Sequence, residues 1–204
     1  MSRASNTAAR RLQIVEAMSK VMARSGYEGA TINAVAEEAG LTPGLVHYHF
    51  KSKLEILLSL ISGLENAVTE RFENRLKIKD GDNPKVQLKA FIESFLALGK
   101  DSNPDAVACW IAIGTEALRD EQIKEAYQDV SSRQLLQLEK IIKDCLKVSL
   151  QETRAARQIA LGIYAAIEGC YRLQVCAPQM VQPGFAAPTV LRMAEGLLMA
   201  PKRS

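Results

Sequence analysis

The chain lacks the features that mark several classes of protein. Its 204 residues hold no apolar run of about 18 residues, the length that a helix needs to span a bilayer, and the polar N-terminus does not resemble a signal peptide. The four cysteines form no CxxC pair, which favours buried, reduced thiols over a disulfide framework. We therefore expect a soluble cytoplasmic protein with no membrane partner.

Residues for catalysis and metal binding are also scarce. The only two histidines, His47 and His49, lie two residues apart on an expected helix, so they face different directions and make a poor chelate. No Ser-His-Asp, Cys-His or phosphate-loop pattern occurs, and no cluster of carboxylates suggests a metal site. We expect no enzymatic activity, no bound metal and no cofactor.

Strand signals are missing as well. Aromatic residues make up only 5% of the chain, and no alternating apolar and polar pattern reaches a useful length for a strand. Good helix formers such as Ala, Leu, Lys and Glu are abundant. A composition of 48% hydrophobic and 24% charged residues is that of an ordinary globular protein. The sequence predicts an all-α fold.

The most informative segment runs from residue 31 to residue 53. Thr31 and Thr42 each precede a short apolar-periodic run, where a side-chain oxygen caps a helix N-terminus. Pro43 stands at the first helical position, where a missing N–H is harmless, and Gly40 can take the positive φ of a tight turn. The pattern predicts two short helices, at about 32–39 and 43–49, joined by a turn.

Apolar residues on these two helices face each other. They are Ile32, Val35, Ala36 and Ala39 on the first helix, and Val46 and Phe50 on the second. Two short helices that share a small core across a glycine turn form a helix-turn-helix, which leaves the outer face of the second helix free to enter a DNA groove.

The distribution of charge supports an anionic partner. Residues 1–53 contain seven basic and four acidic residues, whereas the other 151 residues carry 19 of each sign. The whole net charge of +3 therefore lies in the segment that holds the helix-turn-helix, although so small an excess is also common on a solvated surface.

The remaining helices follow from periodicity and breaker residues. Residues 1–6 are expected to be a disordered arm, and the first helix to run from about Thr7 to Ser25 and stop at Gly26. Further helices are predicted at about 53–78, 84–100, 104–118, 121–148, 151–176 and 188–199, with a loop from Pro178 to Pro188. This gives about nine helices, arranged as a three-helix DNA-binding head (1–53) and a larger helical ligand-binding and dimerisation domain (54–204).

At this point the chain resembles the TetR family of one-component transcriptional repressors. The matching residues are Gly26-Tyr27, Thr31-Ile32, Val35-Ala36, Ala39-Gly40-Leu41, Gly44, Phe50 and Lys51-Ser52-Lys53-Leu54. The family usually carries Tyr three residues after the equivalent of Gly44, where this chain has His47 followed by Tyr48. Either of these two side chains is therefore a candidate for the usual aromatic contact with phosphate.

The second short helix should act as the DNA reader. Seven residues make a helix about 10 Å long, which fits a major groove about 12 Å wide. Thr31, Thr42 and Lys53 are expected to contact phosphate, and Gly44 to permit close approach. Base contacts would fall to Leu45, His47 and Tyr48, while His49 either contacts DNA or packs beneath the next helix. The expected DNA-binding residues are Thr31, Thr42, Pro43, Gly44, Leu45, His47, Tyr48, His49 and Lys53.

One such head buries too little surface for genomic specificity, so we expect a homodimer on a palindromic, double-stranded operator. The natural interface is the pair of C-terminal helices, whose apolar residues are too numerous to stay exposed. They are Ile159, Leu161, Ile163, Ala166, Ile167, Val190, Leu191, Met193, Leu197 and Leu198.

The C-terminal part resembles the choline-responsive BetI-like branch of the family, through Trp110-Ile111-Ala112, Glu116 to Asp120 and Glu168-Gly169. The resemblance implies a small-molecule inducer that binds within helices 84–176, moves helix 53–78 and separates the two heads. Aromatic rings with one carboxylate suit a quaternary ammonium such as choline, although the same stripe is also typical of a core or a dimer interface. The candidate ligand residues are Phe91, Phe95, Trp110, Ile113, Tyr127, Tyr164, Glu168 and Tyr171.

The expected function is that of a ligand-responsive, sequence-specific DNA-binding repressor. Two alternatives stay open at this stage. An activator of the same fold would differ only in where its operator lies relative to the promoter. A weakly specific architectural protein would discriminate little between operator and random DNA at physiological salt.

Overall fold

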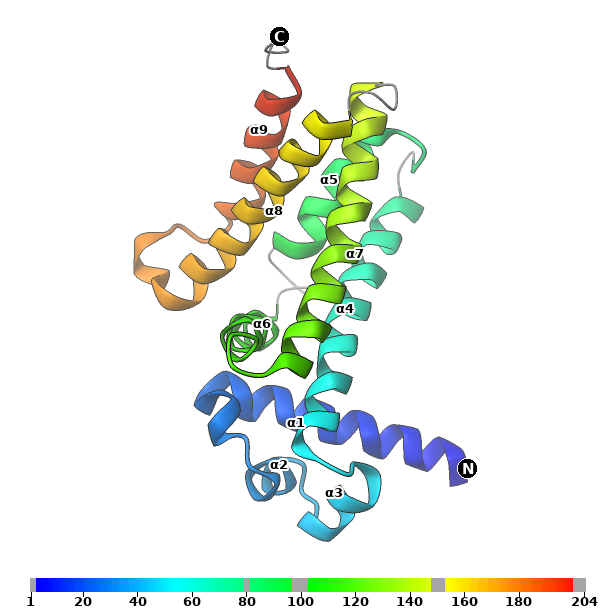
Figure 1. Cartoon of the computed structure of the whole chain (residues 1–204), viewed down its shortest axis with the longest axis vertical. Coiled ribbons are helices and arrows are strands. Elements are labelled where there is room, and N and C mark those ends of the chain that lie inside the picture. Colours follow the sequence, from blue (N-terminus) through cyan, green and yellow to red (C-terminus); the bar gives the residue numbers. More distant parts are fainter. Residues whose placement is uncertain (1–2, 79–80, 97–102, 148–152, 200–204) are drawn as a thin grey trace. The chain divides into compact units, whose positions relative to one another are not determined.

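The computed structural model describes residues 3–78, 81–96, 103–147 and 153–199, and these residues form nine α-helices and one short 3-10 segment without any strand. The all-α prediction is confirmed (Figure 1). The chain divides into two compact units, residues 1–66 with 103–129, and residues 67–102 with 130–204. Each unit is described by itself.

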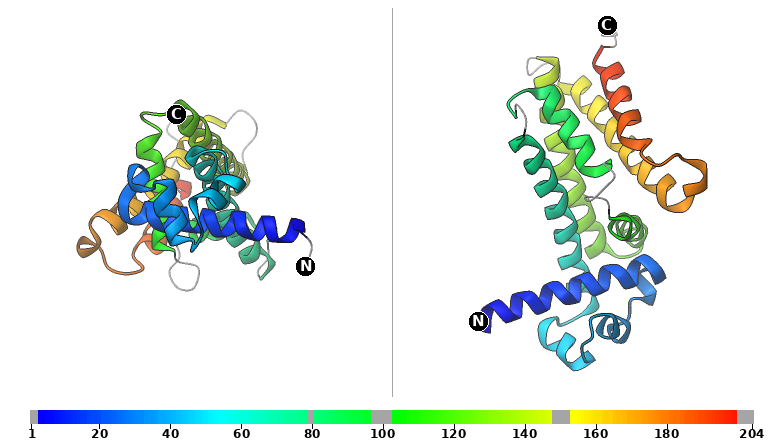
Figure 2. Two further views of the ribbon diagram at one scale, coloured as in Figure 1. Left: turned by 90° about the horizontal axis from the view of Figure 1, so that it is seen from below. Right: turned by 180° about the vertical axis from the view of Figure 1, so that it is seen from behind.

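The first unit contains the helix-turn-helix. It consists of α1 (Arg3–Gly29), α2 (Ile32–Glu38), α3 (Pro43–His49), the first turns of α4 (Lys53–Lys77), α6 (Pro104–Glu116) and the start of α7 (Glu121–Leu146). Helix α1 packs against α2, α3 and α6 (Figures 1 and 2). Four apolar residues spaced along one face of α1 are buried, and they are Ile14, Met18, Val21 and Met22.

Helix α1 differs from its predicted bounds at both ends. It begins at Arg3 and so includes residues 3–6, which were predicted to be a disordered arm. These residues include neither Gly nor Pro, so nothing in them stops a helix from extending one turn further. At the other end the regular helix breaks at Gly26 (φ 67°), as predicted, but a short helical turn continues to Gly29.

The second unit is a set of packed helices. It comprises the rest of α4, α5 (Pro84–Leu96), the rest of α7, α8 (Thr153–Cys176), the 3-10 segment η2 (Pro178–Met180) and α9 (Ala186–Met199). Helix α5 packs against both α8 and α9, and α8 and α9 lie side by side (Figure 2). The predicted end of the helix near residue 100 and the predicted start at 151 lie outside the described residues.

Three residues predicted at a dimer interface belong instead to the core of this unit. Ile163, Ile167 and Val190 are buried within the single chain, because α8 and α9 turn their strongest apolar faces toward α5 and each other. Helix α9 also begins earlier than predicted, at Ala186, which places Pro188 in its first turn. Proline is harmless there because a first-turn N–H has no intrahelical acceptor.

A buried carboxylate joins α7 to α8. Glu139 on α7 accepts from Lys143 of the same helix at 2.7 Å and from Arg157 of α8 at 3.1 Å. The bond from Lys143 and then that from Arg157 lower the pKa of Glu139, against the opposing effect of burial. Glu139 is therefore ionised at neutral pH and holds the two helices in register.

Candidate functional site

Two threonines start the helices of the helix-turn-helix. The Thr31 hydroxyl accepts the N–H of Ala34 at 3.1 Å, and the Thr42 hydroxyl accepts the N–H of Leu45 at 3.3 Å. Both predicted N-caps are confirmed, and α3 has the predicted bounds with Pro43 in its first turn.

A glycine turn ends α2 and redirects the chain into α3. Gly40 adopts φ 64°, and its N–H donates to the carbonyl of Glu37 at 3.0 Å. The N–H of Leu41 reaches back to the carbonyl of Ala36 at 2.9 Å, which completes a Schellman motif. Because only Thr42 separates this motif from α3, the direction of α3 is set by local backbone bonds.

Helix α3 turns one face inward and the opposite face to solvent. Val46 is buried, as is Phe50 just after the helix, as predicted for core residues. Tyr48 is 73% exposed and Leu45 37% exposed. We call the exposed residues of this surface the reading face: Thr42, Pro43, Gly44, Leu45, His47 and Tyr48.

Two further candidate residues flank the reading face. Thr31 is exposed at the start of α2. His49 is half-buried, and its ring meets the edge of Tyr48 with centroids 5.0 Å apart and an interplanar angle of 86°. His49 thus contacts a residue of the reading face, and a contact of its own with DNA stays a prediction.

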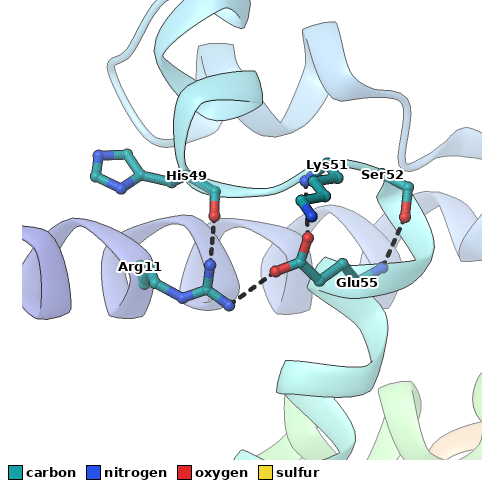
Figure 3. Close-up of polar contacts among 5 residues, drawn as sticks. All are labelled: Arg11, His49, Lys51, Ser52 and Glu55. Atoms are coloured by element: carbon teal, nitrogen blue, oxygen red, sulfur yellow. Dashed lines mark hydrogen bonds and ion pairs between the residues drawn. The ribbon is translucent and has the colours of Figure 1, made fainter.

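Arg11 of α1 binds the C-terminal end of α3, a role that the sequence did not reveal. Its Nη1 donates to the backbone carbonyl of His49, and its Nη2 donates to Glu55 of α4 at 3.1 Å (Figure 3). The guanidinium also lies over the Phe50 ring, 3.9 Å from the centroid. We call Arg11 with these three partners the Arg11 clasp, because one side chain holds α1, α3 and α4 together.

Glu55 completes the clasp by capping α4. Its N–H donates to the Ser52 hydroxyl at 3.1 Å, and its carboxylate accepts the N–H of Lys51 at 2.7 Å (Figure 3). The Lys51 bond, followed by the hydrogen bond and charge of Arg11, lowers the pKa of Glu55. The Ser52-x-x-Glu55 spacing is that of a capping box, a signal present in the sequence.

Lys53 is held against the break in α1. Its Nζ donates to the carbonyl of Tyr27 at 3.0 Å and lies 3.9 Å from the centroid of the Tyr27 ring. Burial, followed by the charges of Asp120 and Glu116, raises the pKa of Tyr27. An ammonium carries three donors, so a phosphate contact by Lys53 stays a prediction alongside this structural role.

The candidate ligand residues divide between the two units. In the first unit, Trp110 and Tyr127 stack with centroids 4.7 Å apart at 26°, and Ile113 is buried. The second unit holds the other five candidates: Phe91, Phe95, Tyr164, Glu168 and Tyr171.

Phe95 is the centre of the aromatic cluster in the second unit. Its ring centroid lies 5.0 Å from that of Phe91 and 6.4 Å from those of Tyr164 and Tyr171. Tyr171 is buried, and its hydroxyl donates to the Phe95 carbonyl at 3.3 Å. Burial raises the pKa of Tyr171 far above its ordinary value, so its hydroxyl stays protonated. Tyr164 and Glu168 are only half-buried.

The structure adds a polar residue to this cluster that the sequence did not single out. The Gln134 side chain on α7 is buried, and its Oε1 accepts the Tyr164 hydroxyl at 2.9 Å. Glutamine is usually a surface residue, so nothing in the sequence distinguishes Gln134 from the exposed glutamines of the same helix.

Neither a metal site nor a membrane helix occurs within the described residues. No three His, Cys, Asp or Glu side chains gather there in a way that could hold a metal ion. None of the helices in the same residues has both the length and the apolarity needed to cross a bilayer.

Comparison with known families matches both parts of the chain. Residues 14–60 match the family model of bacterial regulatory proteins of the tetR family, and residues 84–199 match that of the C-terminal domain of BetI-type transcriptional repressors. The HTH-type transcriptional regulator BetI of Rhizobium meliloti is 30% identical over 166 residues, which cover 79% of this chain and 76% of that protein. The fatty acid metabolism regulator protein of Bacillus subtilis is 32% identical over 92 residues, 45% of this chain and 47% of that protein.

Solved structures share the fold. A transcriptional regulator from Saccharomonospora viridis in complex with choline superposes with a TM-score of 0.74 at 22% identity, covering 94% of this chain and 96% of that one. The regulator FadR of Bacillus subtilis in complex with stearoyl-CoA gives a TM-score of 0.70 at 24% identity, with 92% and 97% covered. Together with the two family models, the solvent-facing α3 identifies the chain as a DNA-binding transcriptional regulator of the TetR family with a BetI-type C-terminal domain.

Proposed function

We propose that this regulator is a repressor that binds a palindromic operator as a homodimer and is released by a small-molecule inducer. The observation that carries the DNA-binding part is the amphipathic α3, whose apolar side is buried while its reading face is exposed. Residues 1–53 would bind DNA, and residues 54–204 would bind the inducer and form the dimer.

The reading face suggests a division of labour between residues. Thr31, Thr42 and Lys53 would contact phosphate. Pro43 and Gly44 would let the N-terminal end of α3 approach the DNA backbone. Leu45 would contact thymine methyl groups, and His47, Tyr48 and His49 would read base edges or stack. Retaining fragments from a random DNA library on the purified protein tests this proposal, and selection of no common sequence would contradict it.

The dimer would form through solvent-facing positions of α8 and α9. Leu161 on α8 is 46% exposed, and Met193 and Leu197 on α9 are also exposed. Gly162 and Gly169 lie in the middle of α8, also exposed, and a Cβ added to either would meet nothing within 4 Å. A mid-helix glycine destabilises the helix by about 1 kcal/mol relative to alanine. Close approach of a second copy's helix would explain why glycine occupies these two positions.

A charge placed on this face tests the dimer. Leu161→Glu should shift the protein from dimer to monomer in light scattering, because two carboxylates would oppose each other across a two-fold axis. Its operator affinity should fall by about 100-fold or more, since the second head would no longer be tethered to the first. Leu136→Glu is the matched control, because Leu136 is an exposed leucine on α7. A wild-type monomer at micromolar concentration would contradict the proposal.

The proposed inducer is a quaternary ammonium compound such as choline. Tyr164 and Glu168 lie one turn apart on α8 and are half-buried, and the Tyr164 ring contacts that of Phe95. Ring faces and one carboxylate would therefore meet the cation. Phe91 and Tyr171 would hold the Phe95 ring in place through their ring contacts with it. Trp110, Ile113 and Tyr127 remain predicted ligand residues in the other unit.

Thermal melting and operator release test the inducer. Choline should raise the melting temperature and lower operator affinity, since a ligand stabilises the state that it binds. Stearoyl-CoA serves as the comparison probe, because it is bound by a regulator of the same fold. Release by stearoyl-CoA alone would overturn the quaternary ammonium proposal and leave ligand-responsive repression intact.

A further inference from the structure

Two polar side chains interrupt the buried side of α7 within the second unit. Val130 and Leu138, one turn before and one turn after Gln134, are fully buried apolar residues. Gln134 itself is only 8% exposed, and Ser131 is its neighbour three positions earlier on the helix. A buried glutamine beside a serine thus interrupts the apolar stretch between Val130 and Leu138.

The Ser131 hydroxyl is buried without a hydrogen-bond partner among the described residues. A serine inside a helix commonly donates to the carbonyl four residues earlier, and this one does not. Burying a hydroxyl without a partner is unfavourable, so an orphaned oxygen of this kind indicates a position where another group supplies the bond. The Ser131 hydroxyl therefore keeps its donor and acceptor capacity unused at a buried position.

Gln134, three residues after Ser131 on α7, presents further donors. Its Oε1 is occupied by the Tyr164 hydroxyl at 2.9 Å, whereas its amide nitrogen carries two N–H donors. Tyr164 in turn meets the Phe95 ring edge to face, at 6.4 Å and 82°. The Gln134 amide is thus joined through Tyr164 to the aromatic cluster in which the cation is proposed to bind.

We propose that Ser131 and Gln134 form a subsite for an uncharged oxygen of the inducer, in the first instance the hydroxyl of a hydroxyalkyl quaternary ammonium. The inference rests on the proposed inducer class and adds the group that sets specificity. Neutral donors satisfy a hydroxyl oxygen, whereas a carboxylate moved from water to a buried site needs a cation to offset its desolvation. The subsite would therefore select a ligand with a hydroxyl group over one with a carboxylate at this position.

The test removes one hydroxyl from the ligand and one from the protein. Choline and ethyltrimethylammonium, which differ by that hydroxyl, are titrated into the full-length protein by calorimetry. Wild type should bind choline about tenfold more tightly, the range expected for one or two neutral hydrogen bonds. Ser131→Ala should reduce this ratio at least threefold by weakening choline binding alone. Ser132→Ala, which changes the exposed neighbouring serine, should leave the ratio unchanged.

The ligand-free stability of Ser131→Ala separates recognition from a structural role. Loss of an unpartnered buried hydroxyl should leave the melting temperature equal to or above that of wild type. Equal affinity of wild type for the two cations would overturn the subsite but not the inducer class. An equal fall in the affinity for both cations in Ser131→Ala would have the same meaning. If neither cation binds, the inducer class and the subsite both fall.

Discussion

Replacing Arg11 with alanine should loosen α3 without altering any residue of the reading face. The substitution removes the donors to the His49 carbonyl and to Glu55, together with the stacking on Phe50. Helix α3 is only seven residues long, too short to be stable alone. Its C-terminal end would then be held by the buried Val46 and Phe50 and by the bond from the Lys51 N–H to Glu55.

The size of the effect follows from the three contacts. A half-exposed hydrogen bond to the His49 carbonyl contributes about 1 kcal/mol, and a stacking cation about 0.5 kcal/mol. The ion pair with Glu55 adds only about 0.5 kcal/mol, because both side chains are more than one-third exposed and water screens the charges. A loss of about 2 kcal/mol corresponds to about 30-fold faster exchange of the protected α3 amides.

Hydrogen exchange at the Phe50 amide, which bonds to the Val46 carbonyl at 2.9 Å, measures this loss directly. The matched control is Arg10→Ala, which removes the same charge one residue earlier and breaks only a bond to Gln13. We expect the control to change exchange less than twofold. The exchange rate in Arg11→Lys should lie between those of wild type and Arg11→Ala, because an ammonium keeps the charge but cannot make both hydrogen bonds of the guanidinium.

Operator binding gives the second measurement. A loosened α3 should lower the ratio of matched to scrambled operator affinity by about tenfold, since base contacts depend on its position. The dependence of affinity on salt should stay unchanged. If exchange is unaffected in Arg11→Ala and the salt slope instead falls by about 0.9, Arg11 contacts phosphate and the clasp does not have this role.

Three further predictions address pH, the turn and the reading face. The pKa of Glu55 is lower in the folded protein than its ordinary value of 4.5. The stability that Glu55 contributes is therefore present above pH 4.5 and is lost as pH falls through the lower folded pKa. Glu55→Gln should flatten the fall of the melting temperature below pH 4.5, and an unchanged profile would contradict the assignment. Gly40→Ala should lower the free energy of unfolding, measured in urea, by about 1 kcal/mol, because Gly40 has a positive φ. Gly63→Ala, at an exposed position of α4, should raise the free energy of unfolding by about 0.5 kcal/mol. A change of the same sign in both variants would refute the argument. Tyr48→Ala should change the sequence retained from a random library, while Lys53→Ala should weaken all sequences alike, and an unchanged preference in Tyr48→Ala would remove that residue from base reading.

Local signals made the helix-turn-helix predictable. Thr31, Thr42, Pro43 and Gly40 act through bonds that span only a few residues, so their roles could be inferred from spacing alone. The start of α9 was less predictable, because Pro188 is compatible with any position in a first turn.

Long-range contacts were not predictable in the same way. Arg11 lies 38 residues from His49 and 44 from Glu55, and a basic residue in a basic segment gives no sign of an internal partner. Ile163 and Val190 are apolar, which is equally compatible with a core and with a dimer interface, and only the packing of α8 against α5 and α9 assigns them to the core. Whether the predicted site residues bind DNA and inducer stays a prediction.

The stacked pair in the first unit supplies a built-in optical reporter. Trp110 is the only tryptophan in the chain, is 8% exposed and stacks on Tyr127. Its emission therefore comes from one dry location between α6 and the start of α7. Any event that separates these two rings or admits water between them should shift that emission, so unlabelled protein can be followed in real time by fluorescence.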